Sequence, residues 1–158
     1  MNSLCHLFFA NLLLVFGAPS IVSPTALLIT SIAAIIIDLE HIAHLTTALK
    51  TRRFKSETRS RWHELTGLLL TMAGSLTIMH FSAMVGRLLL IGFVSHYFLD
   101  LLTRPIRPLF PLSKKVVFLG LAPRNLKKLT IYDTIITATM GIILIVSLHN
   151  LGLLNIGW

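Results

Sequence analysis

The sequence predicts an all-α protein of one domain (1–158), an integral membrane bundle of about five helices. Hydrophobic residues make up 54% of its 158 residues and charged residues only 13%, too little charge to cover a soluble domain of this size. The apolar residues fall into segments of helical length separated by polar or turn-forming residues. The single cysteine, Cys5, excludes an internal disulfide and any multi-cysteine zinc motif. A metal site in this chain must therefore use histidine and carboxylate.

The first two predicted helices are joined by a short turn. The first is Ser3–Phe16, which lacks the leading basic residues and the cleavage pattern of a signal peptide, so we expect it to be retained. The turn is Gly17-Ala18-Pro19-Ser20. The second helix begins with Ser23 as N-cap and Pro24 at the first helical position. We expect it to continue toward Leu49, long enough to cross a hydrocarbon core of about 30 Å.

Two basic segments separate the other predicted helices. Segment 50–61 precedes the third helix, and segment 104–128 lies between the fourth and the fifth. The apolar parts of these three helices are Leu65–Phe81, which Trp62 and His63 precede, Leu88–Leu102, and a last helix that ends near Leu148. The connection between the third and fourth helices is expected at Ser82–Gly86. Thr130 and Asp133 fit a capping box, which predicts the start of the fifth helix.

Helices joined in this way alternate in direction, so the first, third and fifth start on the face where the second and fourth end. That face gathers nearly every acidic group and thirteen of the 14 Lys and Arg residues, all except Arg87. The positive-inside rule makes it cytoplasmic, which predicts an inner (plasma) membrane protein with its N-terminus in and its C-terminus out. Basic residues that flank apolar segments indicate anionic membrane lipid as the partner, with no nucleic acid expected.

Histidine and carboxylate side chains stand at this face, where apolar segments begin or end. His96 and Asp100 are four residues apart and Asp38 and His41 are three apart, so each pair shares a helix face and can bind one ion. Imidazole and carboxylate suit zinc, and three or four such ligands with one position left for water make a catalytic site. The further candidate ligands on this face are His63 and His6.

The same face offers candidates for the other parts of a hydrolytic site. A metal lowers the pKa of its bound water and polarises an ester or phosphoryl oxygen. Glu40 or Glu64 could take the proton from that water. Arg104 and Arg107 follow the His96/Asp100 pair and could hold an anionic headgroup.

Other interpretations of these residues remain open. A His/Asp pair four residues apart could be an interhelical hydrogen-bond clamp, and Asp38 could be a carboxylate that reaches the interface at a helix end. Buried histidines and carboxylates also build ion pathways in transporters, although the polar groups here gather at one face. A noncatalytic scaffold that binds anionic lipid is the third alternative.

Four stretches resemble the LexA-regulated, membrane-bound, metal-dependent hydrolase family, also called the YdjM family. They are Asp38-Leu39-Glu40-His41, His63 with Thr66, Ser95 to Thr103 (SHYFLDLLT), and Pro108-Leu109-Phe110-Pro111-Leu112. The third stretch is the most specific, because it matches the family pattern S-H-x-x-L-D-x-x-T. The resemblance implies a metal-dependent hydrolase, and it extends from about His6 to Ser113.

The family is distantly similar to zinc-dependent phospholipase C and to P1-type nucleases, and this likeness implies a set of ligands. The first metal's ligands would be Asp38, His63, His96 and Asp100, with His6 and His41 as further candidates for that metal or a second. The chain departs from the family at Glu40, where the family has Asp, and in 61–67, which holds one His where the family has two. We therefore expect one ion, and cleavage of a phosphoester of a lipid or membrane-associated substrate.

Overall fold

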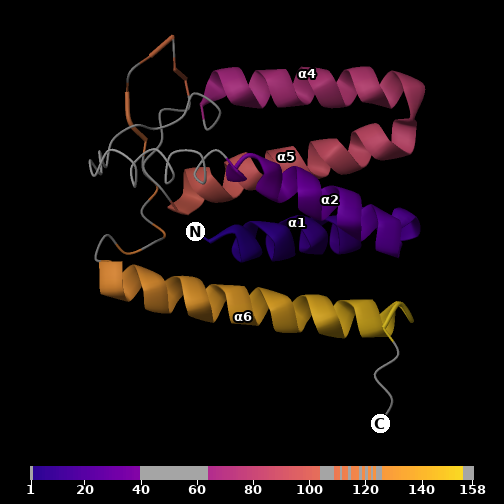
Figure 1. The fold of residues 1–158 in the computed structure, drawn as a ribbon. Helices are drawn as coiled ribbons and strands as arrows, with labels where there is room; N and C mark the ends of the chain where they lie inside the picture. The colour runs from indigo at the N-terminus through magenta and orange to yellow at the C-terminus, as the bar shows by residue number, and fades with distance from the viewer. Residues whose placement is uncertain are drawn as a thin grey trace, which may run out of the picture.

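The computed structural model describes residues 2–39, 64–103 and 126–154, with short stretches at 109–110, 112–113, 115–117, 119, 121 and 123. Within this part of the chain the α-helices are α1 (Ser3–Gly17), α2 (Pro24–Ile36), α4 (Leu65–Phe81), α5 (Ala83–Thr103) and α6 (Leu126–Asn150). A short 3-10 helix, Pro19–Ile21, joins α1 to α2. The prediction of an all-α fold is confirmed. The helices also alternate in direction as predicted, with α1, α4 and α6 starting at the end of the bundle where α2 and α5 finish (Figure 1).

Local sequence signals set several of the helix ends. The Ser23 side chain accepts a hydrogen bond from the Ala26 N–H and Pro24 takes the first helical position, as predicted for the start of α2. Asn2 caps α1 by accepting from the Cys5 N–H. After α6, Gly152 adopts a φ of 70° and its N–H donates to the His149 carbonyl, which closes the helix with a left-handed turn.

Two predicted boundaries were wrong, and the predicted second helix is interrupted before residues 40–49, which lie outside the described residues. The connection between α4 and α5 is Ser82 alone, because the Ser82 carbonyl already accepts from the Gly86 N–H and α5 starts at Ala83. The fifth helix begins four residues before Thr130, since Leu126 to Leu129 are good helix formers, so the predicted capping box lies inside α6. The regular part of α2 ends at Ile36, where the Asp38 N–H donates to the Ile35 carbonyl in a tighter turn.

The bundle has a core of three helices with one further helix on each side. Helices α1, α2 and α5 pack against one another, while α4 packs on α5 and α6 packs on α1 (Figure 1). The fully buried side chains Leu14, Ala26 and Leu88 join the three core helices in one apolar cluster. The core helices therefore carry the buried interior, and α4 and α6 form its flanks.

Helices α2 and α5 approach each other closely at Gly92. A Cβ atom placed on Gly92 would lie 2.5 Å from the Ala33 Cβ and 2.7 Å from the Thr30 carbonyl oxygen. Small residues at such crossings let helix backbones come together, which is common in membrane bundles. Gly92 thus fixes the distance between the backbones of these two helices.

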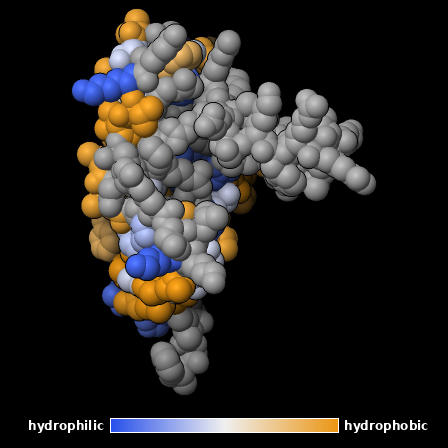
Figure 2. Space-filling view, turned by 90° about the vertical axis from the view of Figure 1, so that its left-hand side faces the viewer, coloured by the Kyte–Doolittle hydropathy of each residue, from blue (hydrophilic) through white to orange (hydrophobic). Residues whose placement is uncertain are grey.

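Much of the outer surface is apolar. Large hydrophobic side chains point outward along both flanking helices, including Leu69, Leu76, Ile135, Ile142 and Val146. Figure 2, which views the molecule from the end where α1 begins, shows hydrophobic side chains over much of the coloured surface, with hydrophilic ones among them. Two helices, Ala83–Thr103 and the Lys128–Asn150 part of α6, are long and apolar enough to cross a membrane. The 13 residues of α2 extend about 20 Å, less than the predicted full span.

Substitution of Gly92 tests the crossing of α2 and α5. We expect Gly92→Ala to lower the free energy of unfolding by about 1–3 kcal/mol, because the added methyl group meets the Thr30 backbone and cannot be accommodated by a side-chain movement. Gly74→Ala is the matched control, since a Cβ there meets nothing within 4 Å. Thermal unfolding in detergent measures both variants, and equal melting temperatures would contradict the proposed close contact.

Candidate metal centre

Four ionisable side chains from the three core helices meet at one end of the bundle. His6 comes from the second turn of α1, Asp38 from the turn after α2, and His96 and Asp100 from the last two turns of α5. Three of the four residues are almost completely buried, with exposed fractions of 1% for His6, 0% for His96 and 3% for Asp100. Ionisable groups buried to this degree must be stabilised by one another or by a bound ion. The four side chains therefore form one electrostatic unit, which we call the His/Asp cluster.

The two histidine rings form the centre of the cluster. The rings of His6 and His96 are stacked, with their centroids 4.0 Å apart and their planes at 21°. The Asp100 carboxylate faces both rings, because its Oδ1 lies 3.5 Å from His6 Nε2 and its Oδ2 lies 3.7 Å from His96 Nε2. Asp38 approaches from α2, with Oδ1 at 3.9 Å from His96 Nε2. The Nε2 atoms of both rings thus face carboxylate oxygens.

The backbone of α2 fixes the orientation of His96. His96 Nδ1 lies 2.7 Å from the carbonyl oxygen of Ala34, and a carbonyl can only accept a hydrogen bond, so Nδ1 must carry a proton. In the neutral ring this leaves the lone pair on Nε2, the nitrogen that faces the two carboxylates. Gly92, one turn before His96, brings the two helices close enough for this bond. Metal-binding histidines commonly have such a partner on the second nitrogen.

The spacing of the ligand atoms fits a metal ion. One ligand atom each from His6, Asp38 and His96 lie within 4.8 Å of one another. The ring-to-carboxylate distances of 3.5–3.9 Å are longer than hydrogen bonds. They are close to the separation of about 3.4 Å expected for two atoms bound tetrahedrally to zinc at about 2.1 Å. His6 is also buried with neither ring nitrogen hydrogen-bonded within the described part of the chain. These residues could hold a metal ion.

Sequence reasoning identified most of this cluster. The i, i+4 pair His96/Asp100 and the carboxylate of Asp38 lie together, as their spacing and the alternation of the helices predict. His6 was predicted only as a further candidate ligand. It lies at the centre of the cluster, with its ring stacked on that of His96. Five predicted site residues lie outside the described part of the chain: Glu40, His41, His63, Arg104 and Arg107.

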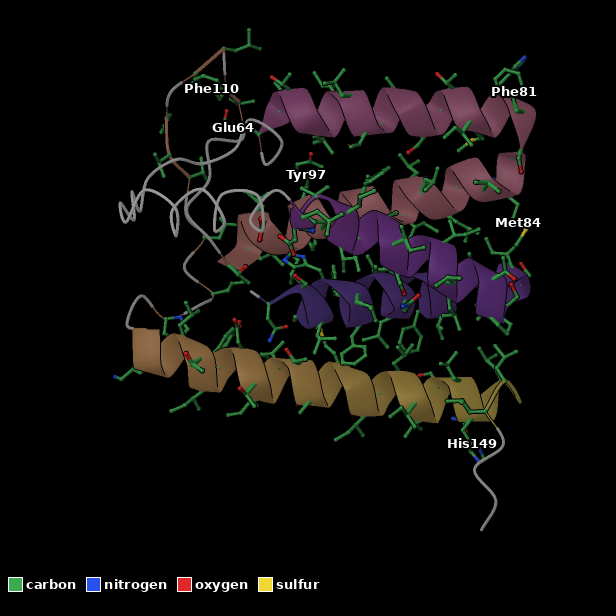
Figure 3. The ribbon with its side chains drawn as sticks, in the orientation of Figure 1. Glu64, Phe81, Met84, Tyr97, Phe110 and His149 are labelled. Atoms are coloured by element: carbon green, nitrogen blue, oxygen red, sulfur yellow. The ribbon has the colours of Figure 1, made fainter. Side chains whose placement is uncertain are left out.

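Glu64, the other predicted proton acceptor, lies at the same end of the bundle as the cluster. It directly precedes α4 and its exposed fraction is 2%. Figure 3 shows it at the start of α4, on the side of α5 where Tyr97 is labelled. Two contacts to the cluster were missed from the sequence, the Ala34 carbonyl and the hydroxyl of Ser3, which donates to Asp38 Oδ2 at 2.9 Å. Neither residue type carries a sequence signal for such a role.

Comparisons with known proteins found no match: no model of a protein family, no curated protein and no solved structure is similar to this chain. The interpretation of the cluster rests on its own geometry and on the sequence pattern.

The place of His6 in the cluster predicts a loss of metal when it is removed. We expect purified His6→Ala to retain less than half of the divalent metal bound by the wild type, because the variant lacks one of three close ligand atoms. His80→Ala is the control, since His80 lies in the last turn of α4 at the other end of the bundle. Metal content per protein, measured by elemental analysis, gives the answer. Equal metal content in the two variants would show that His6 is not a metal ligand.

Proposed function

We propose that this chain is a membrane-bound, zinc-dependent hydrolase that cleaves a phosphoester of a lipid or of another membrane-associated substrate. One observation carries the proposal: two stacked imidazoles and two carboxylates are gathered at one end of an apolar helical bundle. Such groups are unfavourable in an apolar environment unless they pair with one another or bind a metal, and they mark functional sites in membrane proteins. The family resemblance of the sequence supports hydrolysis as the reaction.

The membrane assignment is supported by the apolar surface and the lengths of two helices. Helices α5 and α6 are long enough to span, and α6 exposes large hydrophobic side chains such as Ile131, Ile142 and Ile145. We place the cluster at the cytoplasmic side of the inner membrane, because both basic segments of the sequence connect helices at that end. The bundle would then sit with its N-terminus inside and its C-terminus outside.

Zinc is the ion that the donor set favours. Imidazole nitrogen with carboxylate oxygen is a ligand combination of catalytic zinc sites, and the ligand atoms of His6, Asp38 and His96 lie within 4.8 Å of one another. We propose one ion, held by His6, His96 and one or both carboxylates, with the predicted ligands His41 and His63 as possible additions. A bound zinc ion supplies a Lewis acid that lowers the pKa of its water and polarises a phosphoryl oxygen.

The residues of the chain have separate tasks in this proposal. The Ala34 carbonyl holds His96 in one tautomer and orientation, and Asp100 faces both imidazoles from one side. Glu64 or Glu40 accepts the proton of the attacking water. Arg104 and Arg107, which follow α5 in the sequence, bind the anionic headgroup.

A transporter is the main rival, and the polar groups in the middle of the bundle argue against it. Asn11 of α1 donates to the Ser31 hydroxyl of α2 at 2.7 Å, and Ser75 of α4 donates to the Thr71 carbonyl of its own helix. These groups are neutral, whereas an ion pathway requires ionisable or coordinating groups across the membrane. A noncatalytic scaffold would bind lipid without needing the His/Asp cluster at all.

Removal of Asp100 tests the metal and the chemistry together. We expect the wild type to bind about one zinc ion and to release phosphate-containing headgroup from phospholipid in mixed micelles. Asp100→Ala should lose most of the metal and reduce cleavage at least 100-fold, because the carboxylate that faces both histidines is gone. Asp133→Ala, which removes a carboxylate from α6, should keep both properties.

The outcomes of that experiment separate the rivals. Wild-type protein that contains no metal under metal-replete conditions would refute the site. Stoichiometric metal without cleavage of any phospholipid would refute phospholipid as the substrate and favour a transporter or a metal-stabilised scaffold. Full function of Asp100→Ala in cells would favour the scaffold.

The proposed orientation makes a separate prediction. Alkaline phosphatase, which is active only outside the cytoplasm, should be active when fused after Trp158, because the five helices alternate in direction, so that α1 starts at one end of the bundle and α6 finishes at the other. The same enzyme fused after residue 57, in the first basic segment, should be inactive. Activity in the reverse pattern would invert the proposed topology and place the cluster outside.

A further inference from the structure

We propose that Ser3 is a positioning residue that determines which oxygen of Asp38 is presented to the metal. The Ser3 hydroxyl donates to Asp38 Oδ2 at 2.9 Å, whereas Asp38 Oδ1 is the atom that lies 3.9 Å from His96 Nε2. The two oxygens of this carboxylate therefore have different partners. This inference rests on the proposed metal site and adds a residue to it that the sequence pattern did not indicate.

Asp38 needs such a partner because its backbone lies beyond the regular part of α2. The helix ends at Ile36, and the Asp38 N–H makes a tighter bond to the Ile35 carbonyl. A side chain on such a turn is less fixed by its own helix than His96 or Asp100, which lie within α5. The bond from Ser3, a residue 35 positions earlier in the sequence, restricts the rotation of the carboxylate.

The backbone position of Ser3 is fixed by the start of α1. Ser3 is the first residue of α1, whose start is capped by Asn2, and the Asn2 side chain also accepts a hydrogen bond from Thr137 of α6 at 3.3 Å. Ser3 and His6 are three residues apart, so they lie on the same face of α1. One face of this helix thus supplies a ligand candidate, His6, and the residue that orients another, Asp38.

The hydrogen bonds that orient His96 and Asp38 come from different parts of the chain, one from the main chain and one from a side chain. His96 is oriented by the main-chain carbonyl of Ala34, which side-chain substitution leaves in place. Asp38 is oriented by the side chain of Ser3, which a single substitution removes. With the Ser3 hydroxyl absent, Asp38 Oδ2 loses the bond that restricts the rotation of the carboxylate, so the binding mode of Asp38 and the metal affinity should change. Partners of this kind typically alter metal affinity about 10- to 100-fold.

The test compares three variants of the full-length protein in detergent. Zinc affinity is measured by competition with a chromophoric chelator, and we expect Ser3→Ala to bind zinc about tenfold more weakly than the wild type. Ser3→Thr keeps the hydroxyl and should restore the affinity. Ser147→Ala is the matched control, because the Ser147 hydroxyl also makes one hydrogen bond, to the Ile143 carbonyl of α6, and should leave the affinity unchanged.

A second measurement separates positioning from a general loss of structure. The visible spectrum of the Co²⁺-loaded protein reports coordination geometry, so it should change in Ser3→Ala and not in Ser3→Thr. Thermal unfolding of the metal-free protein should be the same for the wild type and Ser3→Ala, since Ser3 is exposed. Zinc affinity and Co²⁺ spectrum identical to the wild type in Ser3→Ala would overturn the inference and leave the metal site standing. Absence of zinc and Co²⁺ binding by the wild type would overturn both.

Discussion

The His/Asp cluster depends on the close contact between α2 and α5 at Gly92. Because Gly92 has no side chain, the backbone of α2 comes near enough for the Ala34 carbonyl to reach His96 Nδ1 one turn further along α5. The same approach brings Asp38, which follows α2, to the other nitrogen of His96. The close packing of α2 on α5 and the orientation of His96 therefore both depend on the contact at Gly92.

Helix α1 completes the arrangement from the opposite side. Its second turn stacks His6 on His96, and its first residue bonds to Asp38, so α1 contacts the side chains contributed by both other core helices. Helices α4 and α6 contribute no member of the cluster and instead carry much of the exposed apolar surface. In the proposed membrane bundle, the exposed hydrophobic side chains of α4 and α6 would face lipid.

The sequence predicted the fold class, the alternation of the helices and most of the cluster, because each depends on a local pattern. Apolar segments and the Ser23-Pro24 start indicate helices, and the spacing of His96 and Asp100 places both on one face. The starts of α5 and α6 were predicted less well, since α5 begins at Ala83, directly after Ser82, whose hydroxyl accepts from the Val85 N–H, and α6 begins four residues before the predicted cap Thr130. The roles of Gly92, Ala34 and Ser3 depend on which residues of distant helices meet, and no local pattern contains that information.

The location of the cluster at one end of the bundle bears on the kind of chemistry it can support. The interior between α1 and α2 contains a neutral pair, Asn11 and Ser31, whereas the histidines and carboxylates of the His/Asp cluster lie at one end of the core helices. A site at the end of a membrane bundle lies at headgroup depth, where water and the polar part of a lipid both reach it. Water is the second substrate of hydrolysis, and a phosphoester is the first polar group of a phospholipid that such a site would meet. In the proposed membrane orientation, the position of the cluster therefore suits the proposed hydrolysis at the membrane surface better than transport through the membrane.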